Sequence, residues 1–417
     1  MNTTSQNKNW LGINSLGRIG KLTLWEQIAQ RHFDGFVVNV GRELGKGIEA
    51  IIQTIETDST YGSLSRFLYG YSKQHLDITI IDEQEGIIEI EGLTIKVLRS
   101  ARNPKDIAWK EHGVRLVVDC TGAYKDPTSG VDDPKGSIRG HLEGGAEKVI
   151  ISAPFKIKDP AALMPNDSGM FIYGINHLDF DPRKHQVISA ASCTTTGLSH
   201  MIKPLLENEE TSRILTASMS TIHASTNTQS ILDSVPKAGA GDLRKNRSIF
   251  NNIILTSTGA AKALEQVLPE IQHVGFMADS VRIPTNTASL IALNVTFGTT
   301  LDAKQEPTIN REQLNNLYQA AANGAQKGLL TFNTKQNVSA DIIGLQSAIL
   351  IEGHETHTRT GFLSISAEIL KSAGIDHLDD TIRIPVTHAK IFGWYDNEYG
   401  SYTYCLGKLI KHVDKHM

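Results

Sequence analysis

Short apolar runs alternate with segments of helical periodicity over the first half of the chain. One apolar run ends at Ile13, a glycine-containing turn follows at 14–20, and residues 21–31 have a helical pattern. Further β-branched runs occupy residues 36–40, 116–118 and 149–152. Strands separated by helices are typical of a parallel sheet with crossover connections. The pattern predicts a doubly wound α/β domain of the Rossmann type.

The segment 41–110 is longer than such a crossover needs. Its stretch 78–98 alternates apolar and polar residues and has turn signals at Glu85-Gly86 and Glu91-Gly92. We therefore expect antiparallel strands there, as an elaboration of the nucleotide fold.

A strand-like run at 186–192 leads into Cys193, and residues 194–206 have a helical pattern, which predicts that Cys193 begins a helix. Strand-rich segments at 214–223 and 289–297 then indicate an α+β domain. We divide the chain into a dinucleotide-binding domain at 1–192, completed by a C-terminal helix at 397–417, and a catalytic domain at 193–396.

Composition narrows the class of protein. The 417 residues have a formal net charge of -4 and contain no block of five or six like charges, which argues against a general attraction to nucleic acid or acidic membranes. Three widely spaced cysteines suit reduced thiols better than a disulfide framework. A polar start and no 18-residue apolar stretch predict a cytoplasmic protein without membrane insertion.

The turn after the first strand is a candidate cofactor site, because glycines there let the backbone approach a pyrophosphate at a helix N-terminus. In the usual G-x-G-x-x-G spacing Ser15 replaces the first glycine, while Gly17 and Gly20 remain. A purely structural turn is the alternative interpretation. Val40 stands where a ribose-binding carboxylate is usual, and Arg42 follows it. This favours NADP over NAD, unless Arg42 is only a solvated loop residue.

Cys193 and His223 are the candidates for covalent chemistry. Unpaired N–H groups and the macrodipole at a helix start lower the pKa of a cysteine thiol. The hydroxyls of Ser192 and of the threonines at 194–196 can bind anions around it. His223 follows a strand-like run and can accept the thiol proton. The alternatives are a buried inert cysteine and a structural histidine.

Six blocks then occur in a fixed order: ASCTT from Ala191, IHASTNTQSILD from Ile222, DLRKNR from Asp242, LTSTGAAKALEQVLPE from Leu255, VRIPT from Val281 and WYDNEYG from Trp394. With GINSLGRIGK near the N-terminus, they resemble the signature blocks of the phosphorylating glyceraldehyde-3-phosphate dehydrogenase family. The similarity covers most of 11–152 and 173–296 plus the C-terminus.

The resemblance implies roles for individual residues. Cys193 would be the nucleophile, and His223 would be its base and the later proton donor. Substrate and phosphate contacts would come from Ser192, Thr194, Thr226, Thr228, Lys245, Arg247, Thr258, Gly259 and Arg282. Cofactor contacts would come from Asn14, Gly17, Arg18, Ile19, Arg42, Thr121, Gly122 and Asn397.

The implied activity is NAD- or NADP-dependent oxidation of glyceraldehyde 3-phosphate, with inorganic phosphate releasing an acyl phosphate from a cysteine thioester. The implied assembly is a homotetramer. Two alternatives stay open: a dehydrogenase of another phospho-aldehyde such as erythrose 4-phosphate, and a regulatory paralogue with vestigial chemistry.

Some features depart from the family pattern. Ser15, Val40 and Lys245 replace more usual residues, Leu255 replaces a common proline, and extra segments lie in 41–110 and 352–380. His354, Glu355 and His357 lie in the second insert without further ligands, and we predict no metal site there.

Overall fold

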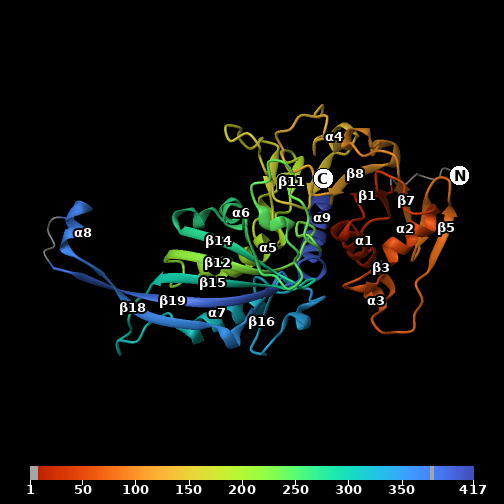
Figure 1. Cartoon of the computed structure of the whole chain (residues 1–417). Helices are drawn as coiled ribbons and strands as arrows, with labels where there is room; N and C mark the ends of the chain where they lie inside the picture. The colour runs from red at the N-terminus through yellow and green to blue at the C-terminus, as the bar shows by residue number, and fades with distance from the viewer. Residues whose placement is uncertain (1–7, 376–379) are drawn as a thin grey trace. The chain divides into compact units, whose positions relative to one another are not determined.

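The computed structural model describes residues 8–375 and 380–417, and the chain divides into two compact units (Figure 1). Unit 1 comprises Met1–Cys193 and Glu398–Met417, and unit 2 comprises Thr194–Asn397. The chain therefore passes from unit 1 to unit 2 directly after Cys193. Each unit is built around its own sheet.

Unit 1 contains a nine-stranded sheet of order β10-β11-β9-β8-β1-β2-β7-β6-β5. Its strands are β1 (Trp10–Asn14), β2 (Gly35–Asn39), β5 (Ile78–Asp82), β6 (Ile87–Ile90), β7 (Leu93–Leu98), β8 (Val114–Asp119), β9 (Lys148–Ile151), β10 (Ser168–Met170) and β11 (Val187–Ser189). All pairs from β10 to β7 are parallel. Numbered in chain order, the seven parallel strands from β7 to β10 read 3-2-1-4-5-7-6, and the first five follow the Rossmann order 3-2-1-4-5. The predicted fold class is confirmed.

The elaboration at 78–98 is also confirmed. Strands β5, β6 and β7 pair antiparallel, and β7 joins them to the parallel sheet beside β2. The turn between β5 and β6 needs Gly86, whose φ is 67° and whose added Cβ would lie 2.7 Å from the carbonyl oxygen of Val97.

Helices cover this sheet. They are α1 (Arg18–Gln30), α2 (Gly47–Glu56), α3 (Leu64–Tyr69), α4 (Gly140–Glu143) and α9 (Tyr404–His416), with a small pair of strands β3 (Thr57–Asp58) and β4 (Gly62–Ser63). A π-helical turn, Tyr399–Thr403, precedes α9. One apolar face of α9, with Leu406, Leu409 and Val413, is buried in the same core as Ile13 and Trp25. The C-terminal helix thus completes the hydrophobic core of unit 1.

Unit 2 contains a mixed sheet of order β13-β14-β12-β15-β19-β17-β16, and β18 pairs with β19. The strands are β12 (Ile214–Ala224), β13 (Ile254–Ser257), β14 (Gly275–Ile283), β15 (Ser289–Gly298), β16 (Leu330–Asn333), β17 (Ile349–Glu352), β18 (His357–Ile365) and β19 (Ile382–Tyr395). Strand β15 runs antiparallel to both β12 and β19, so the ends of β12 and β19 meet the start of β15. This end of the sheet holds the candidate site.

The helices of unit 2 are α5 (Cys193–Glu207), whose first residue belongs to unit 1, α6 (Ala260–Val267), α7 (Arg311–Asn323) and α8 (Ala367–Ser372). Helix α5 lies close to the sheet because Gly393 has no side chain: a Cβ there would lie 2.7 Å from the sulfur of Met201. Strands β18 and β19 extend beyond the other strands, and α8 lies near the tip (Figure 1). Residues 376–379 of the predicted insert lie outside the described residues.

No helix within residues 8–375 and 380–417 combines the length and apolar character needed to cross a membrane.

Candidate active site

The glycine-containing turn joins β1 to α1 in a tight loop. Ser15, which replaces the first glycine of the motif, has a φ of 95°, a conformation that L residues rarely adopt. Its hydroxyl accepts a hydrogen bond from the N–H of Gly17 at 3.1 Å, which offsets part of the strain. A Cβ on Gly20 would lie 1.9 Å from the carbonyl oxygen of Ser15. Only glycine therefore fits at position 20.

A buried polar network links the carboxyl ends of three parallel strands. The Asn39 amide donates to Asn14 at 2.8 Å, and the Asn14 amide donates to the carboxylate of Asp119 at 2.8 Å. Thr121 donates to the same carboxylate from its N–H at 3.0 Å and its hydroxyl at 2.6 Å. His141 Nε2 lies 3.0 Å from it. The network lies where parallel sheets bind nucleotides.

The electrostatics of this network centre on Asp119, which is fully buried. Burial alone would raise the pKa of its carboxyl, but the hydrogen bonds from His141, Thr121 and Asn14 hold that pKa below its usual value. Asp119 is thus a buried carboxylate that orients two of the predicted cofactor residues, Asn14 and Thr121.

The other predicted cofactor residues of unit 1 lie around the same strand ends. Arg18, at the start of α1, forms an ion pair with Glu398 at 2.9 Å, and Glu398 also accepts from the hydroxyl of Tyr61. Gly122 has a φ of 64° and continues the turn after Thr121. Ile19 is half-buried in the first turn of α1.

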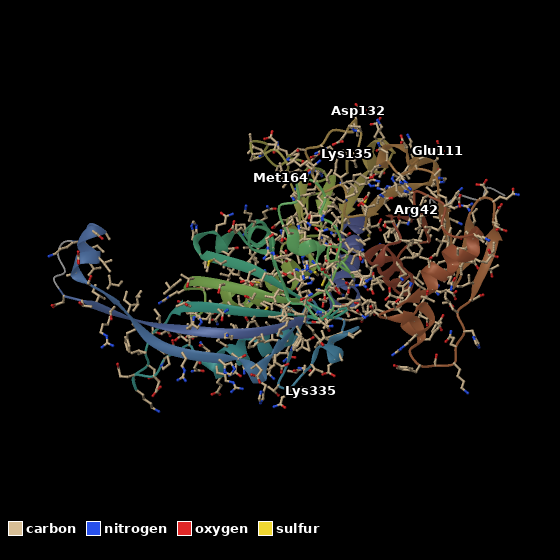
Figure 2. The ribbon with its side chains drawn as sticks, in the orientation of Figure 1. Arg42, Glu111, Asp132, Lys135, Met164 and Lys335 are labelled. Atoms are coloured by element: carbon tan, nitrogen blue, oxygen red, sulfur yellow. The ribbon has the colours of Figure 1, made fainter. Side chains whose placement is uncertain are left out.

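Arg42 follows β2 in the exposed loop that begins at Gly41 (Figure 2). Val40 is half-buried, and its N–H donates to the carbonyl of Leu98 at 2.9 Å. The end of β2 therefore presents an arginine and no carboxylate at the position of the usual ribose ligand.

Cys193 is the first residue of α5, as predicted, and is half-buried. It lies against the apolar core of unit 1, while Ser192 precedes it. The other two cysteines differ from it in their surroundings. Burial raises the pKa of both Cys120 and Cys405 to about 12, so these two remain protonated thiols at neutral pH.

A tyrosine joins the start of α5 to the strand that bears His223. The buried hydroxyl of Tyr395 lies 2.8 Å from Oγ1 of Thr194 and 2.8 Å from Oγ1 of Thr221. Thr194 is bonded directly to Cys193, and Thr221 lies two residues before His223 on β12. Sequence reasoning did not single out Tyr395, although it lies in the WYDNEYG block.

His223 is buried and is surrounded by polar groups. Its Nδ1 lies 2.7 Å from the carbonyl oxygen of Ala224 and 2.6 Å from Nη1 of Arg282, while its Nε2 lies 3.2 Å from Nδ2 of Asn397. Burial, followed by the charge of Arg282, lowers the pKa of His223 to about 4. The imidazole is therefore neutral at physiological pH.

Three of the predicted residues are thus brought together: His223, Arg282 and Asn397. Arg282 lies opposite His223 in the register of β12 and β14. Asn397, predicted to bind the nicotinamide carboxamide, contacts the imidazole in this structure.

The hydroxyls of Thr226 and Thr228 lie 2.9 Å apart just after β12. Gln229, which is buried, holds both: its Oε1 accepts from the N–H of Thr226 at 3.0 Å, and its Nε2 donates to Thr228 at 3.0 Å. Sequence reasoning missed Gln229, although the residue lies in the quoted block IHASTNTQSILD. The available signal in the sequence was an amide side chain directly after Thr228 and three residues after Thr226.

The remaining predicted phosphate residues lie in two further segments. Thr258 and Gly259 precede α6, and Oγ1 of Thr258 accepts from the N–H of Ala260 at 3.2 Å. Lys245 is exposed, and Arg247 forms an exposed ion pair with Asp233 at 3.1 Å. In this structure Arg247 is thus engaged within its own loop.

The histidines of the second insert pair with an acid. His354 and His357 lie 2.8 Å and 3.5 Å from the carboxylate of Glu355. Across residues 8–375 and 380–417, no group of three or more histidine, cysteine or acidic residues has a geometry that could hold a metal ion.

The polar residues of unit 1 fit a dinucleotide. A tight turn precedes a helix N-terminus, and amides and hydroxyls lie at the carboxyl ends of parallel strands. The comparisons agree with this geometry. Residues 10–127 match the family model described as the NAD binding domain of glyceraldehyde 3-phosphate dehydrogenase, and residues 192–397 match the model of its C-terminal domain.

Curated relatives match over nearly the whole chain. The chain is 34% identical over 395 residues to a glyceraldehyde-3-phosphate dehydrogenase of Streptomyces coelicolor, with 94% of each chain covered. It is 33% identical over 392 residues to glyceraldehyde-3-phosphate dehydrogenase 2 of Streptomyces avermitilis and 30% identical over 390 residues to glyceraldehyde-3-phosphate dehydrogenase 1 of Bacillus cereus, again with 94% of each chain covered.

Proposed function

We propose that this chain, which belongs to the glyceraldehyde 3-phosphate dehydrogenase family and is an NAD(P)-dependent oxidoreductase, converts glyceraldehyde 3-phosphate and inorganic phosphate reversibly into 1,3-bisphosphoglycerate. The observation that supports this most is the surroundings of His223, a neutral buried imidazole beside an arginine and an amide. A neutral imidazole can accept a proton, as a general base must.

The proposed reaction begins at the sulfur of Cys193. His223 takes the thiol proton, and the thiolate adds to the aldehyde carbon, forming a C–S bond. His223 then returns that proton to the former carbonyl oxygen, which gives the thiohemiacetal and a neutral imidazole. The bound nicotinamide supplies the hydride acceptor. His223 removes the hydroxyl proton as hydride leaves the same carbon, and a thioester on Cys193 remains. Inorganic phosphate then attacks the thioester carbon, the C–S bond breaks, and the thiolate is regenerated with release of the acyl phosphate.

Two anion sites are proposed for this scheme. Thr226, Thr228 and Arg282 would hold the phosphate ester of the substrate, because two hydroxyls and a guanidinium match its oxygens. Inorganic phosphate would bind near the starts of α5 and α6, with Lys245 and Arg247 as flanking cations. The residues of this second site are Ser192, Thr194, Thr258 and Gly259.

For the cofactor we propose contacts from the strand ends of unit 1 and from Asn397. Arg42 and the absent carboxylate at Val40 favour NADP, because an arginine can bind the 2′-phosphate that a carboxylate would repel. We further propose that the enzyme works in the cytoplasm, as a homotetramer, in glycolysis or gluconeogenesis.

An initial-rate assay tests the proposal. Purified protein should reduce NADP or NAD with glyceraldehyde 3-phosphate, and the rate should require inorganic phosphate. A rate that does not depend on phosphate would indicate hydrolysis of the thioester. Faster turnover of erythrose 4-phosphate would indicate that erythrose 4-phosphate is the preferred substrate. Failure to reduce either cofactor would refute the proposal.

Alkylation distinguishes a catalytically active enzyme from a paralogue with vestigial chemistry. Because the pKa values of Cys120 and Cys405 are about 12, iodoacetamide near pH 7.5 should label Cys193 alone. Peptide mass spectrometry locates the label. A Cys193 that reacts no faster than Cys120 would speak against a nucleophilic role.

A further inference from the structure

A cavity beside β7 is separate from the sites described so far. It has a volume of about 450 Å³ and is lined by β7, the turn between β5 and β6, the loop after β2 and the segment 98–112. No predicted cofactor, substrate or phosphate residue is among its described lining residues. Ligand sites usually measure roughly 300–1,000 Å³, so the cavity can hold a small organic molecule.

Two basic side chains of the cavity are less exposed than the carboxylates paired with them. Nζ of Lys96 lies 3.3 Å from the carboxylate of Glu85, and Nη1 of Arg99 lies 3.4 Å from that of Glu43. The side chains of Lys96 and Arg99 are 23% and 22% exposed, whereas those of Glu85 and Glu43 are 64% and 73% exposed. The positive charges therefore line the inside of the cavity, and these two carboxylates lie at its rim.

Both ion pairs are long and contribute little to stability. Charge-assisted N–H···O bonds usually measure about 2.7–2.9 Å, and exposed ion pairs stabilise a protein only slightly. A bound phosphate group can therefore displace the carboxylates of Glu43 and Glu85 at small cost. It offers Arg99 two oxygens for its planar fork and Lys96 a shorter bond. Asp106, which is exposed, is the third carboxylate of the lining.

His112 is the third basic side chain of the lining. It ends the short 3-10 turn Lys110–His112 and is half-buried. Burial, followed by the charge of Lys96, lowers the pKa of His112, while Glu111 and Glu85 act in the opposite direction. The imidazole is therefore mostly neutral at pH 7.5. A dianion bound in the cavity would favour its protonated form.

Another part of the lining is apolar. Leu98 and Ala108 are half-buried, and Leu98 packs against the core cluster that contains Ile107 and Trp109. An apolar surface beside three basic side chains fits a molecule with both a phosphate and an organic group. We propose that this cavity binds an organic phosphate. Its phosphate group contacts the three basic side chains, and its organic group lies against Leu98 and Ala108.

The imidazole of His112 is a local reporter of binding. The full chain, labelled with 15N-histidine, is titrated with phenyl phosphate, which has a phosphate ester and an apolar ring. The His112 signals in proton–nitrogen correlation spectra are assigned by their loss in His112→Gln. We expect these signals to shift in a saturable manner, and the pKa of His112 to be higher at saturation than without the probe.

Three variants sharpen the test. Arg99→Ala should raise the Kd of phenyl phosphate about tenfold, as for a lost charge-assisted hydrogen bond. Glu43→Gln should lower that Kd about two- to fivefold, because a competing carboxylate is lost, and misfolding cannot cause a gain in affinity. Arg183→Ala, at an exposed arginine outside the cavity, should bind the probe as the parent protein does.

Two further ligands identify what the cavity recognises. Inorganic phosphate lacks the organic group and should bind about tenfold more weakly than phenyl phosphate, because it buries no apolar surface. Saturating NADP should leave the response of His112 to phenyl phosphate unchanged, since the predicted cofactor residues lie elsewhere.

Four results would overturn the inference. They are His112 signals that do not respond at any concentration of phenyl phosphate, an unchanged Kd in Arg99→Ala, equal affinity for inorganic phosphate, and loss of the response at saturating NADP. The last result would place the cavity within the cofactor site. None of these measurements depends on dehydrogenase activity, so the inference and the proposed function can fail separately.

Discussion

Nη1 of Arg282 lies 2.6 Å from Nδ1 of His223, on neighbouring parallel strands whose register places the two residues opposite each other. This contact joins the residue proposed to bind the substrate phosphate to the residue proposed to move protons. It also adds to the effect of burial, so that the pKa of His223 falls to about 4.

The depressed pKa of His223 makes stability depend on pH. In the unfolded chain this imidazole takes up its proton near pH 6.5, but in the folded protein only near pH 4. Its contribution to the free energy of unfolding is therefore present above pH 6.5 and is lost as the pH falls toward 4. Between pH 7 and pH 4.5 the parent protein should lose about 2 kcal/mol more than His223→Gln. Urea denaturation at both pH values measures this. If the parent protein and His223→Gln lose equal free energy of unfolding, the pKa of His223 is not lowered.

Gln229 should matter for phosphorylated substrates in particular. Gln229→Ala removes the partner of both Thr226 and Thr228, so the two hydroxyls lose their fixed positions. We expect KM for glyceraldehyde 3-phosphate to rise about tenfold, the value of roughly one hydrogen bond, with little change for unphosphorylated glyceraldehyde. Steady-state kinetics with both aldehydes checks this. Gln272→Ala, at an exposed glutamine, is the control, and an equal loss with both aldehydes would indicate a merely structural role.

Asp119 should support both folding and cofactor binding. Asp119→Asn removes a buried carboxylate that accepts from Asn14, Thr121 and His141. The NH2 group of the new amide would then face hydrogen-bond donors of these residues. We expect the free energy of unfolding to fall by about 3 kcal/mol and the Kd of NAD(P) to rise. Denaturation and isothermal calorimetry measure the two effects. Asp132→Asn, whose side chain is 96% exposed, should change neither. A stable variant with unchanged affinity would remove Asp119 from the cofactor site.

Arg42 should set the preference between the two cofactors. Arg42→Ala removes the proposed ligand of the 2′-phosphate, so kcat/KM for NADP should fall about tenfold, as for a lost charge-assisted hydrogen bond. The value for NAD should stay within about twofold, because NAD lacks that phosphate. Lys46→Ala, in the same exposed loop, controls for general charge. If both cofactors lose equally, Arg42 does not discriminate between them.

The sequence predicted those features that depend on local pattern. Alternating apolar runs and helical periodicity identified the α/β domain, the antiparallel strands at 78–98 and the helix that starts at Cys193. Motif order identified His223, Arg282 and Asn397 as candidates. The strands and helices could be predicted because each depends on residues a few positions apart, and the site residues because each lies in a short motif.

Contacts set by the register of distant strands could not be predicted in this way. Ser289 meets Asn397 because β15 pairs with β19, and Tyr395 reaches Thr221 because β15 lies between β19 and β12. The contact of Tyr395 with Thr194 depends on how α5 packs on the sheet. The positive φ of Ser15 could not be predicted either, because a serine residue in the sequence does not indicate a left-handed backbone conformation.

A covalent intermediate on Cys193 tests the central claim most directly. The protein is mixed with NADP or NAD and glyceraldehyde 3-phosphate without inorganic phosphate, quenched in acid and digested for mass spectrometry. The account predicts a phosphoglyceroyl group on the Cys193 peptide that disappears when phosphate is added before the quench. Turnover with no acyl group on Cys193, or with the group on another residue, would contradict it.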